Sequence, residues 1–278
     1  METVALSDGE HVPALGQGTW GMGESKSAHA EEVAALRLGI DLGMTLIDTA
    51  EIYGDGGSEK VVADAIEGQR DRIFVVTKVS PRNASRTGLP KACERSLKRL
   101  RIDAIDLYLL HWPSNTPLAE TVEAFEQLRS SGKIRRWGVS NFDVKDMKEL
   151  LAIRNGSACS ANQVLYHVGE RAIESDLLSW SQRNKIPIMA YSPVGRGRRL
   201  LNNATLKKIG ERHDSTPAQI AIAWVLRQSG IIAIPKASNK THVRDNAQSA
   251  DIQLTDQDFA DIDREFPPPQ TKQPLPML

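Results

Sequence analysis

Short apolar runs alternate with longer amphipathic segments along most of the chain. A strand that is buried on both faces of a parallel sheet reads as a continuous apolar run. The segments between the runs carry apolar residues at helical spacing, as Val33, Leu36 and Ile40 do within residues 28–42. Eight runs predict strands, at residues 15–18, 45–47, 73–77, 104–110, 136–139, 157–163, 186–190 and 231–234.

Eight strands that alternate with helices predict parallel βαβ units, and eight closing units predict an α/β fold of the (β/α)8 TIM-barrel type. Residues 4–12 predict an N-terminal β-hairpin, because Asp8-Gly9 favours a tight turn between two short strands. Two additional helices are predicted, and the last helix opens at the capping residue Thr255. No linker or shift in composition divides residues 1–278, which are therefore expected to form a single domain.

A doubly wound open sheet is the structural alternative to the barrel. Such a sheet normally carries a Gly-x-Gly-x-x-Gly turn after its first strand. The glycines at positions 16, 18, 21 and 23 are spaced differently and precede a longer loop. Their spacing favours the barrel.

Composition and charge limit which partners and which cellular location are expected for the protein. The chain has 278 residues with 35 basic and 35 acidic side chains, so its formal net charge is zero. That balance argues against nucleic acid or an anionic membrane as a partner. We see no signal peptide and no run of about 18 apolar residues. Without an additional interface element, a monomer is expected.

The two cysteines, Cys93 and Cys159, are far apart and show neither metal nor redox spacing. Cys93 shares an apolar helical face with Leu97 and Leu100, which predicts a core position. A disulfide framework is therefore not expected, and a reducing cytoplasm fits. No metal site is expected.

Ionisable side chains follow three consecutive predicted strands. Asp48 follows the second strand, Lys78 the third and His111 the fourth, and Tyr53 comes five residues after Asp48. Active-site groups of a barrel lie at the carboxyl ends of its strands, so these four are expected to meet at one mouth. Taken singly, Asp48 could cap the next helix, and each of the others could be a solvated or hydrogen-bonded polar residue. Their joint occurrence favours a catalytic site.

These residues lie within motifs that are similar to those of a known family. The chain resembles the aldo-keto reductase superfamily and, within it, the short bacterial members described as methylglyoxal reductases. The motifs cover nearly the whole chain in the expected order. They are GQGTW at 16–20, LIDTAEIY at 46–53, VTKV at 76–79, DLYLLHW at 106–112, WGVSNF at 137–142, NQ at 162–163, YSP at 191–193 and IPK at 234–236.

The four candidate catalytic residues suit the reduction of a carbonyl group by hydride. The carbonyl oxygen gains negative charge as hydride reaches the carbon, so a proton donor must face it. A free tyrosine has a pKa of about 10 and donates better beside a cation such as Lys78. Asp48 can hold Lys78, and His111 can orient the carbonyl oxygen. The resemblance implies the same roles, with Tyr53 as the general acid.

The resemblance also implies a nicotinamide cofactor. Ser140, Asn141 and Gln163 are expected to bind its carboxamide, and Tyr191 is expected to stack on its ring. From the residues alone, Asn141 could simply precede a helix capped by Asp143, and Tyr191 could be a core aromatic. The other expected cofactor-binding residues are Gly18, Thr19, Trp20, Ser192, Pro193, Val194, Gly195, Ile234, Pro235, Lys236, Ser238, His242, Asp245 and Asn246. The arginine-rich loop 195–199 could add charge there or be a solvated connection.

The cofactor is expected to be NADPH, with NADH as a weaker alternative. Lys236 opens the region that receives the adenosine 2′-phosphate in the family. Many relatives have serine where Ala237 stands and arginine where His242 stands. Loss of that arginine removes a planar phosphate ligand, and Lys236, Ser238 and Lys240 could compensate. The preference for NADPH is therefore expected to be reduced.

The substrate is expected to be a small carbonyl compound. Trp20 and Trp112 are the candidate substrate-binding residues beside Tyr53, and the short loop 112–117 and the short tail leave little chain for a lid. Methylglyoxal, other 2-oxoaldehydes, short aldehydes and aldoses fit such a pocket. One alternative is a lyase or aldolase that forms a Schiff base at Lys78. Another is a cofactor-binding regulatory subunit with low turnover.

Overall fold

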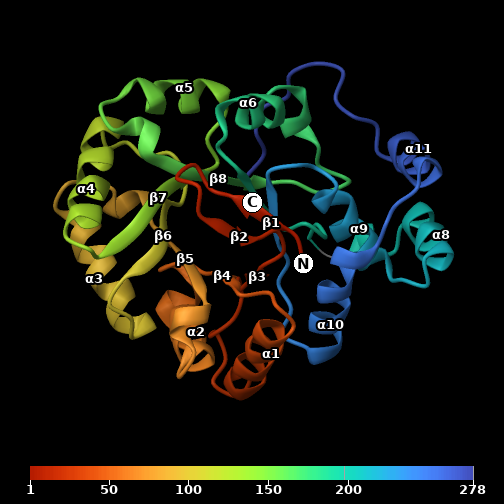
Figure 1. Cartoon of the computed structure of the whole chain (residues 1–278), viewed down its shortest axis with the longest axis horizontal. Coiled ribbons are helices and arrows are strands. Elements are labelled where there is room, and N and C mark those ends of the chain that lie inside the picture. The colour runs from red at the N-terminus through yellow and green to blue at the C-terminus, as the bar shows by residue number, and fades with distance from the viewer. Residues whose placement is uncertain (197, 278) are drawn as a thin grey trace.

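Eight parallel strands form the central sheet of the structure, a computed structural model that describes residues 1–196 and 198–277 (Figure 1). Each strand pairs with its neighbours in chain order. The strands are β3 (Gln17–Gly18), β4 (Leu46–Asp48), β5 (Phe74–Val79), β6 (Ile105–Leu110), β7 (Ile134–Ser140), β8 (Cys159–Leu165), β9 (Ile188–Tyr191) and β10 (Ile231–Ile234).

The first and last strands meet and close the sheet. Leu15 forms a parallel bridge with Ala233, and Gly18 forms one with Lys236. The Gly18 amide donates to the carbonyl of Pro235 at 3.0 Å. An added Cβ at Gly18 would lie 2.7 Å from the Ile234 carbonyl oxygen, so the close approach needs glycine. The predicted barrel is confirmed, and the open-sheet alternative is wrong.

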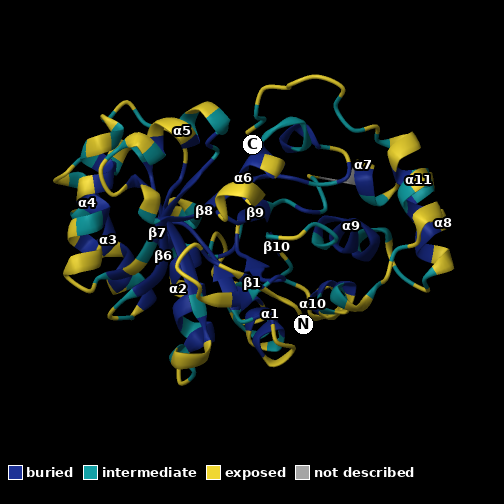
Figure 2. Cartoon of the chain, turned by 45° about the horizontal axis from the view of Figure 1, so that its top comes forward, coloured by how far each residue is buried: buried dark blue, intermediate teal, exposed yellow. Residues whose placement is uncertain are grey.

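Helices surround the barrel, with their exposed sides outward and their buried sides toward the strands (Figure 2). α8 and α11 pack together outside this ring (Figure 1) and correspond to the two predicted additional helices. The four-residue α7 was not predicted. The helices are α1 (His29–Asp41), α2 (Gly57–Ile66), α3 (Gly88–Leu100), α4 (Leu118–Ser130), α5 (Val144–Ala152), α6 (Leu177–Asn184), α7 (Arg198–Leu201), α8 (Ala204–Arg212), α9 (Pro217–Leu226), α10 (Lys240–Gln248) and α11 (Asp256–Glu265).

The predicted hairpin covers one end of the barrel. β1 (Thr3–Ala5) pairs antiparallel with β2 (His11–Pro13). Its side chains Val4, Leu6 and Val12 join the apolar cluster inside the barrel, which also contains Leu46, Val76, Leu107 and Met189. The hairpin also lies beside the amino-terminal starts of β9 and β10. The hairpin therefore covers the amino-terminal end of the barrel and leaves the carboxyl ends of the strands uncovered.

A second apolar cluster lies between the strands and the helices. Trp137 of β7 stacks on Phe125 of α4, with ring centres 5.3 Å apart and planes inclined by 6°. Cys93 is buried in this cluster, as predicted, and Cys159 is also a buried free thiol. Burial raises the pKa of each thiol to about 12, so neither is a reactive thiolate near neutral pH.

Several element boundaries differ from the prediction. In the sequence, Thr116 followed by Pro117 predicts a helix that threonine caps with proline in its first turn. In α4 Pro117 is itself the cap, because its ψ of 126° is extended. The Thr116 amide instead bonds the hydroxyl of Ser114. The spacing of Ile173, Leu177 and Trp180 predicts one face of a single helix, but Ile173 lies in the 3₁₀ turn Ala172–Ser175, before α6. Thr216 also begins a sequence of the capping-box form, and the caps at Asp143, Thr216 and Thr255 are all confirmed. Over the described residues, no helix has the length and apolar character to span a membrane.

Candidate active site

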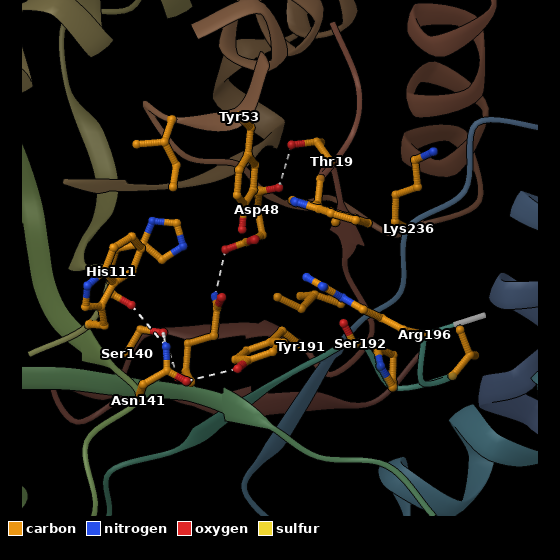
Figure 3. Close-up of a pocket in the computed structure, with 18 of the residues that line it drawn as sticks. Thr19, Asp48, Tyr53, His111, Ser140, Asn141, Tyr191, Ser192, Arg196 and Lys236 are labelled. Atoms are coloured by element: carbon orange, nitrogen blue, oxygen red, sulfur yellow. Dashed lines mark hydrogen bonds between the residues drawn. The ribbon is translucent and has the colours of Figure 1, made fainter. Parts of the chain in front are cut away.

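A cavity of about 540 Å³ opens at the carboxyl ends of the strands (Figure 3). Most of the predicted site residues line it, together with Ile52 and Arg196, which were not among the predicted binding residues. The predicted residues that line it are Gly18, Thr19, Trp20, Asp48, Tyr53, His111, Trp112, Ser140, Asn141, Gln163, Tyr191, Ser192, Pro193, Val194, Gly195, Ile234 and Lys236.

Strand register brings Asp48 and Lys78 together. Side chains two residues apart point to the same face of a strand. Asp48 follows the inward Leu46 by two residues, and Lys78 likewise follows the inward Val76. Asp48 pairs with Val76 across the two strands, so Lys78 lies two residues closer to the carboxyl end of β5 than the residue opposite Asp48. The Lys78 Nζ donates to Asp48 Oδ2 at 2.7 Å and to the Thr49 carbonyl at 2.8 Å.

The Asp48–Lys78 ion pair is buried away from water. Each charge is therefore stabilised by the other and by further hydrogen bonds. Burial opposes the charge of Lys78, but Asp48 and Tyr53 more than offset it, so the pKa of Lys78 is raised. Burial raises the pKa of Asp48, against the opposing effects of Lys78 and Gln163. Gln163 Nε2 donates to Asp48 Oδ1 at 2.7 Å. Such hydrogen bonds help to offset the cost of removing a buried ion pair from water.

Tyr53 lies over this pair, in the loop after β4. The Lys78 Nζ is 5.0 Å from the centre of the Tyr53 ring. Burial raises the pKa of Tyr53, while the Lys78 ammonium and, more weakly, Arg196 act to lower it. The cation therefore acts in the expected direction, although burial has the larger effect. The phenol keeps its proton near neutral pH.

His111 faces Tyr53 as a neutral imidazole. The rings meet edge to face, with centres 5.7 Å apart and an interplanar angle of 73°. Burial and the Lys78 ammonium lower the pKa of His111 to about 2. Its Nδ1 is buried and has no hydrogen-bond partner among the described residues. The ring can therefore bond a ligand as a neutral group, but it cannot act as a cationic acid near neutral pH.

The opposite wall of the cavity is a hydrogen-bonded set from β7, β8 and β9. Asn141 Nδ2 donates to the His111 carbonyl at 3.1 Å and to the Ser140 hydroxyl at 3.2 Å. The Tyr191 hydroxyl donates to Asn141 Oδ1 at 3.0 Å (Figure 3). The Ser140 hydroxyl donates to the Gln163 carbonyl at 2.8 Å. Asn141 and Tyr191 thus line the cavity, and Tyr191 is not a core aromatic.

Two tryptophans and two cations surround the mouth. Trp20 is 54% exposed and Trp112 is 37% exposed, so neither is a core residue. The guanidinium of Arg196 lies 4.5 Å from the centre of the Trp20 ring. Lys236 Nζ donates to the Ser238 hydroxyl at 3.3 Å. The prediction left the loop 195–199 open, and the structure places Arg196 at the cavity, while Gly197 lies outside the described residues.

Six predicted site residues do not line the cavity. Lys78 lies beneath it, where it bonds Asp48 and lies under the Tyr53 ring. Pro235 bonds Gly18 in the closure of the barrel, and Ser238 is linked to the cavity through Lys236. The remaining three lie on α10, where His242 is exposed and Asn246 is buried; they are His242, Asp245 and Asn246. Their cofactor roles stay predictions from the resemblance.

The open end of this closed parallel barrel presents a phenol, a buried ammonium–carboxylate pair and a neutral imidazole. These groups define a barrel enzyme equipped for carbonyl reduction. Residues 14–265 match the model of the Aldo/keto reductase family. The chain belongs to this family and is an aldo-keto reductase, as its sequence motifs indicate.

Relatives and solved structures agree with this membership. Methylglyoxal reductase YeaE of Escherichia coli K12 is 49% identical over the whole chain and 99% of its own length. Glyoxal reductase of Bacillus subtilis 168 is 34% identical, with 94% of this chain and 92% of that protein covered. An aldo-keto reductase of Klebsiella pneumoniae, solved with NADPH, is 49% identical with a TM-score of 0.97 and covers 100% and 99% of the two chains.

Proposed function

We propose that the chain reduces small aldehydes and ketones, such as methylglyoxal and other 2-oxoaldehydes, to alcohols with NADPH. The observation that carries this proposal is the position of the Tyr53 ring, which lies over the buried Lys78 and faces His111. The names of YeaE and of the Bacillus glyoxal reductase support the substrate class. The NADPH complex of the Klebsiella enzyme supports the cofactor.

The chemistry of the cavity wall fits a nicotinamide dinucleotide phosphate. Amide and hydroxyl groups of Ser140, Asn141 and Gln163 would hold the carboxamide, and the partly exposed Tyr191 ring offers a stacking face. Exposed cations at the mouth, Arg196 and Lys236, suit phosphate groups. NADPH, when bound, supplies the hydride.

The protein's part in the reaction is to orient the carbonyl group and to deliver one proton. His111 hydrogen-bonds the carbonyl oxygen and orients it toward Tyr53. As the carbon accepts hydride, Tyr53 transfers its hydroxyl proton to the oxygen, so the products are an alcohol and a phenolate. Lys78 stabilises that phenolate, and Asp48 holds Lys78 in place. A proton from solvent then restores Tyr53.

We also propose a substrate wall, a single-domain organisation, an oligomeric state and a location for the enzyme. Trp20 and Trp112 form an apolar substrate wall at the mouth. The barrel is closed by hydrogen bonds between its first and last strands, which supports a single domain over residues 1–278. We propose a cytoplasmic location, with which two buried free thiols are in keeping, and a monomeric state. Size-exclusion chromatography with light scattering would test the monomer.

A screen of NADPH oxidation with small aldehydes, ketones and sugars tests the proposed function. We expect turnover with methylglyoxal on the order of 1 per second or faster, as is usual for an enzyme. A chain that binds NADPH but oxidises it with none of these carbonyls would instead be the cofactor-binding regulatory subunit.

The preference for NADPH over NADH is a separate prediction. Lys236 is exposed beside Ser238, and His242 is exposed on α10, where it offers no guanidinium to a phosphate. An exposed cation such as Lys236 should contribute about 1.4 kcal/mol to binding of the 2′-phosphate, so we expect roughly a 10-fold higher kcat/KM with NADPH. The variant Lys236→Met should bring the two values together. Equal kcat/KM for the two cofactors in the wild-type enzyme would show that this prediction is wrong.

A further inference from the structure

Glu51 lies between Asp48 and Tyr53, and neither the cavity nor the proposed reaction uses it directly. Its side chain is only 7% exposed. A carboxylate that is buried this far needs hydrogen bonds or a cation to offset the loss of water. The partners of Glu51 therefore show what this residue does.

Among the described residues, the hydrogen-bond and ion-pair partners of Glu51 lie on or after β5. Its amide donates to the carbonyl of Lys78 at 3.2 Å. Its Oε1 accepts from the Ser80 amide at 2.7 Å and from Asn83 Nδ2 at 2.9 Å. Its Oε2 lies 3.3 Å from Nη2 of Arg95 in α3. One residue thus joins the loop before Tyr53 to the chain that follows Lys78.

The Tyr53 loop depends on this connection because its own regular structure is a 3₁₀ turn at Tyr53–Gly56, which left-handed backbone angles at Gly54 and Asp55 interrupt. β4 ends at Asp48, and the Tyr53 amide bonds back to the Ala50 carbonyl at 3.1 Å. Two residues after Tyr53, Asp55 has a positive φ of 51°. The next tie to β5 comes from Glu59, whose Oε1 accepts from the Thr77 hydroxyl at 2.7 Å. Glu51 is therefore the nearer anchor of Tyr53.

We propose that Glu51 is a positioning residue, which fixes the distance between Tyr53 and Lys78 by fastening the Tyr53 loop to the segment after Lys78. This inference rests on the proposed function, in which Tyr53 gives the proton and Lys78 stabilises the resulting phenolate. A displacement of about 1 Å at a reacting group can cost on the order of 100-fold in rate. Loss of the anchor should therefore impair catalysis while the cofactor wall, on β7 to β9, stays in place.

The variant Glu51→Ala tests this role. We expect kcat to fall by about 10- to 100-fold, with the Kd for NADPH unchanged. A phenol held farther from the Lys78 ammonium loses part of the effect that lowers its pKa. Tyr53 would then stay protonated to higher pH, so the alkaline limb of the pH profile of kcat should move upward. The measurements are steady-state kinetics with methylglyoxal across pH and fluorescence titration with NADPH.

Asp106→Ala is the matched control. Asp106 is also a buried carboxylate that accepts from a β5 amide, that of Val75 at 2.8 Å, and it pairs with Arg70 at 2.7 Å. It lies toward the amino-terminal end of the barrel, away from Tyr53. Asp106→Ala should lower thermal stability and leave kcat and its pH profile unchanged. Glu51→Gln keeps an acceptor for the Ser80 amide and should restore most of the activity that Glu51→Ala loses.

The outcomes separate the role of Glu51 from the proposed function itself. A wild-type chain without reductase activity would overturn the proposed function. An active wild type whose Glu51→Ala variant shows the same kcat and pH profile as Asp106→Ala would overturn only the positioning role. Should Glu51→Ala not fold, Asn83→Ala removes one bond to the same carboxylate, and wild-type kcat and an unmoved alkaline limb in that variant would equally overturn the role.

Discussion

Replacement of Tyr53 by phenylalanine should lower kcat for methylglyoxal reduction by roughly 10²- to 10⁴-fold, the contribution expected of a general acid. Phenylalanine keeps the ring that lies over Lys78 and beside His111 but removes the hydroxyl proton. The cofactor wall does not depend on Tyr53, so NADPH should still quench tryptophan fluorescence with an unchanged Kd. Steady-state kinetics and fluorescence titration measure the two effects.

Tyr108→Phe is the control for this variant. Tyr108 is fully buried in β6, meets Phe125 edge to face at 5.8 Å, and its hydroxyl has no hydrogen-bond partner in the described part of the chain. Removal of a buried, unpaired hydroxyl should leave activity intact and stability equal or slightly higher. Retained reduction in Tyr53→Phe would refute Tyr53 as the acid. Loss of activity in both variants would point to a general effect of the substitution.

Replacement of Lys78 by methionine should reduce both activity and stability. Activity should fall by at least ~100-fold, because Tyr53 loses the cation that stabilises its phenolate. Stability at neutral pH should fall by about 3–5 kcal/mol, because Asp48 is left as a buried and unpaired carboxylate. The double variant Lys78→Met/Asp48→Asn should regain much of the stability but not the activity. Urea denaturation and steady-state kinetics separate the two effects.

The stability of the Lys78→Met variant should depend on pH in a definite direction. Burial raises the pKa of Asp48 even in the presence of the ammonium, and loss of the ammonium raises it further. A carboxyl whose pKa is raised by folding binds its proton more tightly in the folded state. The single variant should therefore be most stable near pH 4 and lose stability as the pH rises, and the double variant should show no such loss.

The same lysine decides the remaining alternative reaction. A Schiff base requires an uncharged amine, but the Asp48 carboxylate and the Tyr53 phenol raise the pKa of the buried Lys78. Borohydride added with substrate should therefore leave Lys78 unlabelled, as mass spectrometry of its peptide would show. A reduced adduct on Lys78 would establish the lyase or aldolase chemistry instead.

The elements with continuous apolar runs could be predicted closely, and their boundaries less so. β5 and β6 are buried along nearly their whole lengths and were found within about one to two residues. The cap of α4 was misplaced because either Thr116 or Pro117 suits a helix start by sequence, and only the observed backbone angles of Pro117 distinguish them. Caps with two reciprocal hydrogen bonds, as at Thr216, were predicted correctly.

The site residues also divide into those that the sequence predicts and those whose contacts appear only in the fold. Asp48, Lys78 and His111 could be found because each follows a recognisable strand, and the barrel brings strand ends together. The bond from Gln163 to Asp48 joins residues 115 positions apart, and no local pattern announces it. Arg196 was ambiguous for the same reason, since its contact with Trp20 crosses the mouth of the cavity.

The sequence by itself determined the barrel, the family and the residue types that meet at its open end, because strand periodicity and strand order are local properties of the chain. The tertiary structure decided what those residues are chemically. Burial makes His111 neutral and raises the pKa of Tyr53 above that of a free tyrosine. The fold also brings Ser80 and Asn83, which follow Lys78 in the chain, to the Glu51 carboxylate. These properties depend on the exclusion of water and on contacts between distant segments, which exist only once the barrel has closed.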